Sequence, residues 1–197
     1  LLVDSSMIVV VGHGFGGTLA HRIAKASDGV FSAVIMVGST ALSYEDYLLG
    51  HSNLSSHTAD ELKAYQDTLD KLSKMKEQTA LENTETVLGH SVYYFWELQK
   101  TNNYELIRKL RLPTYIVQGK KDPLVPENEG WRQYNNKIGE GVKYVTYRSF
   151  PGLNHVLMSD SSTDAYGLPQ YTENATLDIS AGRSIGQWIL SLKSTAE

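Results

Sequence analysis

The stretch that most constrains the fold of this chain is residues 7–17, with the sequence MIVVVGHGFGG. Its first five residues, Met7 to Val11, form a continuous apolar run, which is typical of a buried strand in a parallel sheet. The run ends in a glycine-rich turn, and a helical pattern begins at Thr18. A buried strand followed directly by a helix is the first half of a βαβ unit, so this stretch predicts an α/β fold.

The rest of the chain continues the alternation of strands and helices. Further strands are predicted at 31–37, 114–118 and 142–150, and helices at 18–26, at 127–138 and near the C-terminus. Strands joined in this way pair in parallel, so the prediction is a mostly parallel sheet flanked by helices.

Residues 44–111 interrupt this alternation with a helical segment. It contains a capping box, Thr58-x-x-Glu61, ahead of apolar residues at helical spacing, and a polar stretch, 79–89, that is predicted to break the helix. An aromatic cluster follows at residues 93–96. We therefore predict one α/β domain over residues 1–197, with a helical cap inserted at 44–111.

Composition excludes several classes of function. The 197 residues include no cysteine, so there is no disulfide, no catalytic thiol and no thiolate metal site. A net charge of −4 gives no indication of a nucleic-acid partner, and no apolar run is long enough to span a membrane. Because Leu1 stands so close ahead of a core strand, we expect an upstream segment to be missing, and the compartment, cytoplasmic or secreted, stays open.

The glycine-rich turn fits two motifs. Gly12 and Gly16 stand at the flanking positions of G-x-S-x-G, the nucleophile elbow, in which a sharp turn raises one side chain above the sheet. The middle position, which carries serine in that motif, is Gly14. Gly12, Gly14 and Gly17 also spell the dinucleotide-binding pattern G-x-G-x-x-G, but that pattern requires an acidic residue where this chain has Gly38-Ser39.

Two polar residues follow later strands in a significant order. Asp122 comes after the strand at 114–118, and His155 comes after the strand at 142–150. Either residue alone is more often structural, but elbow, acid and histidine is the chain order of a catalytic triad. Asp122 would hold one nitrogen of the imidazole, and the other nitrogen of His155 would face the elbow as a general base. His13 is expected to pack inside the turn.

These motifs together resemble α/β-hydrolase-fold esterases. GHGFGGTLA, the helical insertion, PTYIVQGKKDPLVP and FPGLNHVLM are similar to the C-terminal part of bacterial carboxylesterases of the dienelactone-hydrolase and acyl-aminoacyl-peptidase-like kind. The resemblance covers essentially the whole chain and implies strands equivalent to the fifth to eighth of that fold. It implies an acyl ester substrate and no cofactor. It also places Gly14 at the nucleophile position, Asp122 as the acid, His155 as the base and the N–H of Phe15 in the oxyanion hole.

Gly14 departs from the family pattern because it has no hydroxyl, and this closes the acyl-enzyme route. Three explanations stay open: deliberate inactivation, a natural pseudo-enzyme that binds without cleaving, and residual activity through a water held by His155. Two functional hypotheses follow. The first is an ester hydrolase that is inactive or nearly so as written, and the second is a non-catalytic binding or scaffold protein on the same fold.

Two further expectations concern the surroundings of the site. The strand at 7–11 would lie at the sheet edge without a protective lysine or proline, so we expect an upstream segment or another chain to pair with it. In the insertion, Tyr93, Tyr94 and Trp96 are candidates for the wall of an acyl pocket, although each is individually more typical of the core of the insertion.

Overall fold

The computed structural model describes residues 5–43, 46, 47, 50, 58–72, 74–87, 89–100, 102–159 and 176–193. The chain divides into two units, one formed by Leu1–Ala41 with Asn103–Glu197 and the other by Leu42–Asn102. The second unit coincides with most of the predicted insertion, 44–111, but it ends earlier. Helix α6 (Asn103–Leu110) belongs to the first unit, because its Ile107 packs in the same core as Ala20 and Ala24.

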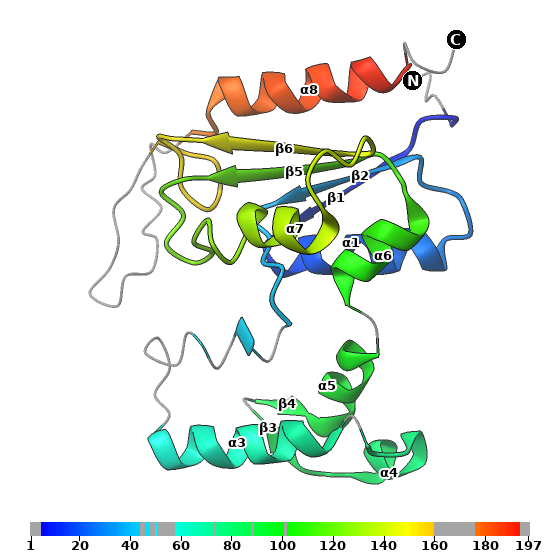
Figure 1. Ribbon diagram of the computed structural model, residues 1–197, viewed down its shortest axis with the longest axis vertical. Coiled ribbons are helices and arrows are strands. Elements are labelled where there is room, and N and C mark those ends of the chain that lie inside the picture. The colour runs from blue at the N-terminus through cyan, green and yellow to red at the C-terminus, as the bar shows by residue number, and fades with distance from the viewer. Residues whose placement is uncertain are drawn as a thin grey trace. The chain divides into compact units, whose positions relative to one another are not determined.

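The first unit is built on a four-stranded parallel sheet with the order β1-β2-β5-β6. Helices cover both faces of this sheet (Figure 1), with α8 on one face and α1, α6 and α7 on the other. The strands are β1 (Val9–His13), β2 (Ala33–Val37), β5 (Thr114–Gly119) and β6 (Val145–Phe150). The helices are α1 (Phe15–Ala26), α6, α7 (Trp131–Ile138) and α8 (Ile179–Lys193).

Each face of the sheet has its own apolar core. The alternate side chains of β2 divide between the two cores, with Val34 and Met36 on the face of α1, and Ile35 on the face of α8. Across the second core, the rings of Tyr115 and Trp188 stack with centroids 5.0 Å apart. Because β2 and β5 are buried on both faces, their sequences read as largely apolar runs.

Several boundaries differ from the predicted ones. β1 lies two residues later than the predicted 7–11, because the ladder with β2 continues through Gly12 and His13. β6 begins at Val145 rather than 142, and α7 begins at Trp131 rather than 127, since turns occupy the preceding residues. The predicted break at 79–89 is partly structured: it contains the end of helix α4 (Glu77–Glu82) and the strand β3 (Thr86–Val87).

β1 is an end strand of the sheet, as expected. Its Val11 is 59 % exposed, although the strand has the composition of a buried one. An apolar edge strand is a template for further pairing. The expectation that an upstream segment or another chain pairs with β1 stays a prediction.

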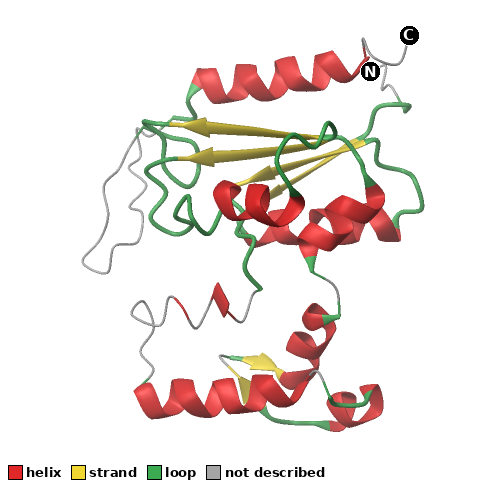
Figure 2. Cartoon of the chain, viewed as in Figure 1, coloured by secondary structure: helices red, strands yellow, loops and turns green. Residues whose placement is uncertain are grey.

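The second unit has a small core of its own. Helix α3 (Ala59–Leu72) begins after the predicted capping box, in which the N–H of Thr58 donates to Glu61 at 2.7 Å. The hairpin of β3 and β4 (His90–Ser91) leads into helix α5 (Val92–Gln99), as Figure 2 shows. The buried residues of this core are Leu69, Leu72, Val87, Val92 and Phe95.

The aromatic residues of α5 are bound into this second unit. Tyr94 and Trp96 pack against its core, and the indole N–H of Trp96 donates to the carbonyl of Met75 at 2.9 Å. Tyr93 stacks on Trp96 with ring centroids 5.7 Å apart. The three residues are half-buried and packed within this unit, and their role in substrate binding stays a prediction. Within the described part of the chain, no helix has the length and apolarity needed to cross a membrane.

A buried histidine on α1 makes the first unit sensitive to acid. His21 is fully buried, and its Nε2 lies 3.0 Å from Oγ1 of Thr114. Because that hydroxyl donates to the carbonyl of Leu112, Nε2 of His21 must donate its N–H to Thr114. Nδ1 therefore carries the lone pair, and it has no hydrogen-bond partner among the described residues. Burial lowers the pKa of His21 from 6.5 to about 4.

We expect this histidine to cost stability as the pH falls. The unfolded chain binds a proton at His21 below pH 6.5, but the folded protein resists until about pH 4. The contribution of neutral His21 to the free energy of unfolding is therefore fully present above pH 6.5. It is lost progressively as the pH falls to 4, by about 3 kcal/mol in all. Urea unfolding at several pH values checks this. His21→Gln, which keeps a donor to Thr114, should lose this component, and an equal pH dependence in both proteins would contradict the assignment.

Tyr134 on α7 ties three segments of the first unit together. Its buried hydroxyl donates to the carbonyl of Thr40 and lies 3.1 Å from Oγ of Ser39. The same oxygen accepts from Nδ2 of Asn103, 3.0 Å away, at the start of α6. Burial raises the pKa of Tyr134 to about 12, so the hydroxyl keeps its proton at neutral pH.

Removal of this hydroxyl by Tyr134→Phe should lower the free energy of unfolding by about 2–4 kcal/mol, because it leaves several buried polar groups without their partner. Tyr147→Phe is the matched control. Its hydroxyl is also buried, but it has no hydrogen-bond partner among the described residues. We expect that variant to unfold at the same denaturant concentration as the parent or a higher one. Equal losses in the two variants would show that the hydrogen bonds of Tyr134 are not the cause.

Candidate active site

The turn between β1 and α1 holds Gly14 in an unusual backbone conformation. Its φ of 54° and ψ of −126° lie in a region that side-chain-bearing residues rarely occupy. The turn is fixed by hydrogen bonds from the N–H of Gly14 to the carbonyl of Val37, at 2.8 Å, and from the N–H of Gly17 to the carbonyl of Gly14, at 3.0 Å. It is also tight: a Cβ on Gly12 would lie 2.3 Å from the carbonyl oxygen of Gly16.

Asp122 lies in the loop after β5, and its carboxylate is held firmly. Oδ1 accepts hydrogen bonds from the N–H groups of Leu124 and Val125, both at 2.9 Å. This is the arrangement of an Asx turn, which orients the side chain through the backbone that follows it. The side chain of Asp122 is 1 % exposed, so its other oxygen, Oδ2, is directed into the protein.

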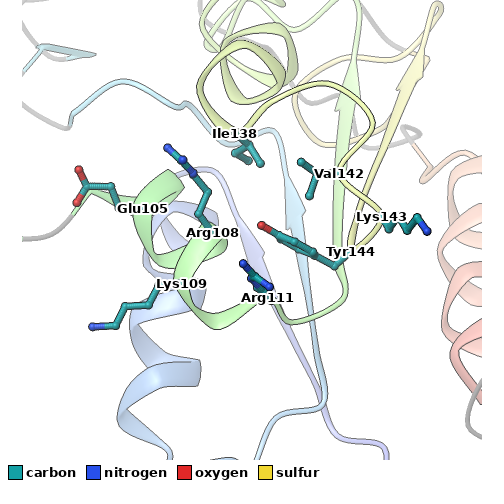
Figure 3. A pocket seen from close by; sticks show the side chains of 8 residues that line it. All are labelled: Glu105, Arg108, Lys109, Arg111, Ile138, Val142, Lys143 and Tyr144. Carbon is teal, nitrogen blue, oxygen red and sulfur yellow. The ribbon is translucent and has the colours of Figure 1, made fainter.

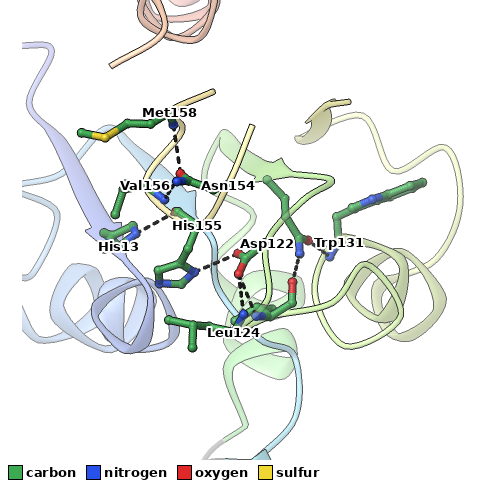
Figure 4. A network of polar contacts seen from close by, with 10 residues as sticks. His13, Asp122, Leu124, Trp131, Asn154, His155, Val156 and Met158 are labelled. Atoms are coloured by element: carbon green, nitrogen blue, oxygen red, sulfur yellow. Dashed lines mark hydrogen bonds and ion pairs between the residues drawn. The ribbon is translucent and has the colours of Figure 1, made fainter. Parts of the chain in front are cut away.

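His155 lies in the loop after β6, which Asn154 and His13 hold in place (Figure 4). The side-chain oxygen of Asn154 accepts from the N–H groups of Val156, at 3.1 Å, and Met158, at 3.0 Å. The Nε2–H of His13 donates to the carbonyl of His155 at 3.0 Å, so the turn after β1 and this loop are joined directly.

The structure brings Gly14, Asp122 and His155 together at the carboxyl ends of the strands. Nδ1 of His155 lies 2.8 Å from Oδ2 of Asp122. A Cβ on Gly14 would lie 3.3 Å from Nε2, the other nitrogen of the same ring. Because the carboxylate accepts the Nδ1–H, Nε2 carries the lone pair. The arrangement can therefore take up a proton from a group placed beside Gly14.

One glycine and one histidine of the site, Gly38 and His13, do more than the sequence indicated. Gly38, after β2, has a φ of 54°, and a Cβ there would lie 3.0 Å from Nδ1 of His155. Gly38 stands where the dinucleotide-binding pattern requires an acidic residue, and its lack of a side chain leaves space for the imidazole of His155. His13 does not pack inside the turn as expected: it is exposed, and its ring lies 4.5 Å from that of His155. The sequence carried no signal for this contact across 142 residues.

Phe15, the predicted oxyanion-hole residue, is the first residue of α1. Its backbone N–H is directed toward the N-terminal end of the helix, as in every first turn. Phe15 directly follows Gly14, so this N–H lies next to the turn, at the positive end of the helix dipole. Its role toward a substrate stays a prediction.

A separate pocket lies near the amino ends of β5 and β6, away from the candidate site. It has a volume of about 720 Å³ and is bounded by the ends of α6 and α7 and by the turn ahead of β6 (Figure 3). It is lined by Glu105, Arg108, Lys109, Arg111, Ile138, Val142, Lys143 and Tyr144. Cations near helix C-termini interact favourably with the helix dipole, which accounts for much of this charge. Among the described residues, no group of acidic and histidine side chains is placed to hold a metal ion.

The parallel sheet with flanking helices and the strand–turn–helix at Gly14 are typical of the α/β-hydrolase superfamily. More specifically, the chain belongs to the prolyl oligopeptidase family, whose model matches residues 1–170.

Individual proteins and solved structures are similar to this chain. Esterase EstD from Thermotoga maritima is 24 % identical over 196 residues, which is 95 % of this chain and 43 % of the relative, so the chain spans less than half of that protein. Among solved structures, a monoacylglycerol lipase from Paleococcus ferrophilus is 17 % identical, with a TM-score of 0.48, over 94 % of this chain and 69 % of that one. Est1E from Butyrivibrio proteoclasticus is 16 % identical, with a TM-score of 0.48, over 76 % and 53 %.

Proposed function

We propose that this chain carries the site of a carboxylic ester hydrolase in which Asp122 and His155 are the acid and the base and Gly14 occupies the position of the nucleophile. The observation that carries this proposal is the approach of Nε2 of His155 to within 3.3 Å of the Cβ position of Gly14. A serine hydroxyl at that position would lie within hydrogen-bonding reach of the base, which is the geometry that activates a nucleophile.

The roles of the other residues follow from this geometry. Asp122 fixes the tautomer and the orientation of His155, and the N–H of Phe15 donates to the oxyanion that forms from the ester carbonyl. The chain as written has no hydroxyl at residue 14 and forms no acyl-enzyme, so the experiment that tests the proposal is Gly14→Ser assayed on short p-nitrophenyl esters.

A binding protein on the same fold is the second candidate, and Gly14 itself favours it. Such a protein would hold an ester or a related acyl compound without turnover. It would need neither Asp122 nor His155, so His155→Ala would leave its affinity unchanged. A pure binder has no need to bury an aspartate and a histidine that are oriented toward each other. The presence of this pair therefore supports the hydrolase.

A further inference from the structure

The glycine at position 14 gives His155 access to a small molecule instead of a side chain. We propose that this chain transfers the acyl group of an ester directly to a small hydroxyl compound, water or a primary alcohol, that binds between Gly14 and Nε2 of His155. The inference rests on the proposed function, because it uses the same base and the same position for the ester. It differs in the group that attacks the carbonyl.

The surroundings of Gly14 leave room for such a molecule. Chain neighbours aside, the described atoms within 4 Å of its Cβ position are Nε2 of His155, at 3.3 Å, and Cε1, at 3.8 Å. A hydroxyl group there meets a hydrogen-bond acceptor, Nε2 of His155. A serine would fill this position with its own Cβ and Oγ, whereas the glycine leaves the position to a small molecule.

The imidazole is equipped to activate that hydroxyl. Nδ1–H is committed to Oδ2 of Asp122 at 2.8 Å, so Nε2 is the nitrogen that accepts a proton. Asp122 is held in turn by two backbone N–H groups, and the carbonyl of His155 is held by His13. The ring therefore has one orientation, which supplies the positioning that an unassisted water molecule lacks.

The transfer balances without any other reactant. The hydroxyl oxygen of the acceptor attacks the ester carbonyl carbon while its proton passes to Nε2. The bond from that carbon to the alcohol oxygen of the ester then breaks, and the proton on Nε2 passes to the departing alkoxide. Water as the acceptor gives the carboxylic acid, and methanol gives the methyl ester. In both cases the second product is the alcohol of the original ester, and no covalent enzyme intermediate forms.

The experiment measures the methyl ester that forms from p-nitrophenyl acetate as methanol is added to this chain. We expect methyl acetate to form at a rate that rises with methanol concentration, about 100-fold above His155→Gln, as general-base catalysis typically provides. tert-Butanol, whose branched carbon does not fit beside the imidazole, should not act as an acceptor. Gly14→Ala should abolish the transfer, because its methyl group occupies the acceptor position.

The outcomes separate this inference from the proposed function. Methyl acetate formation in the parent chain that disappears in His155→Gln and in folded Gly14→Ala supports the inference. If the parent chain matches His155→Gln while Gly14→Ser hydrolyses the ester, the inference is overturned and the proposed function stands. If neither protein exceeds His155→Gln, both are overturned. If the transfer persists in Gly14→Ala, the attack takes place elsewhere and the inference is also overturned. If Gly14→Ala does not fold, persistence of the transfer in His155→Gln overturns the inference in the same way.

Discussion

Gly14→Ser is expected to raise the rate of hydrolysis of a short p-nitrophenyl ester by about 10³-fold or more above that of Gly14→Ala. The introduced Cβ lies 3.3 Å from Nε2 of His155, close enough that the imidazole must yield by a few tenths of an ångström. The hydroxyl then hydrogen-bonds to a base whose tautomer Asp122 has already set. Loss of a serine nucleophile removes several orders of magnitude of rate, so its restoration should recover a large part of that factor.

Gly14→Ala is the matched control because it carries the same backbone strain without the oxygen. A non-glycine residue at φ 54° costs of order 1–3 kcal/mol, and both variants should unfold at similarly reduced denaturant concentrations. The difference between them isolates the hydroxyl. After treatment with a fluorophosphonate, the serine variant should gain the mass of the phosphonyl group, with fluoride as the leaving group. The alanine variant should gain no mass. A folded Gly14→Ser protein that neither hydrolyses the ester nor takes up the label would contradict the proposed site.

Much of the fold follows from local sequence patterns. The apolar runs that became β2 and β5 are buried on both faces of a parallel sheet, and such runs have few other solutions in a chain of this length. The ends of the elements were less predictable, because they depend on partners. β1 extends through His13 because His13 pairs with Val37 of β2. Helix α6 belongs to the first unit because its Leu106 and Ile107 are buried there.

The residues of the candidate site could be predicted from the sequence, but the contacts that hold them in place could not. Asp122 and His155 were identified from their order after two strands, and the carboxyl ends of parallel strands meet at one edge of the sheet. The contacts that fix them are long-range or involve the backbone. The approach of His155 to Gly38, and the hydrogen bond from His13 to the carbonyl of His155, depend on the packing of loops that are distant in the sequence. No periodic pattern encodes such contacts.

The same distinction explains why Gly14 does not argue against a hydrolase site. The turn keeps the φ and ψ values that present a side chain at its tip, and its neighbours keep the clearances that those values require. Gly38 is likewise bare where the imidazole passes. These features are independent of whether residue 14 carries a hydroxyl. A serine at residue 14 would therefore add an attacking group to a turn and a base that already lie close to the positions that it needs.

In the Gly14→Ser background, Asp122→Asn should lower kcat/KM by about 10³–10⁴-fold. The reason lies in the two hydrogen bonds that Oδ1 of Asp122 accepts from Leu124 and Val125. An asparagine must keep its carbonyl oxygen toward those N–H groups, so its NH₂ faces Nδ1 of His155. Nδ1 must then accept a hydrogen bond, the proton moves to Nε2, and the imidazole presents a donor to the introduced serine hydroxyl where a base is required.

This effect can be distinguished from a simple loss of stability or charge. Asp28→Asn removes a carboxylate at an exposed turn with a φ of 49°, a conformation that asparagine accepts well, and it should leave the rate unchanged. In the Asp122→Asn double variant, attack depends on the serine alkoxide, so the rate should keep rising about tenfold per pH unit in alkaline solution. A small loss of rate with an unchanged pH profile would mean that Asp122 supports the loop but does not set the tautomer of His155.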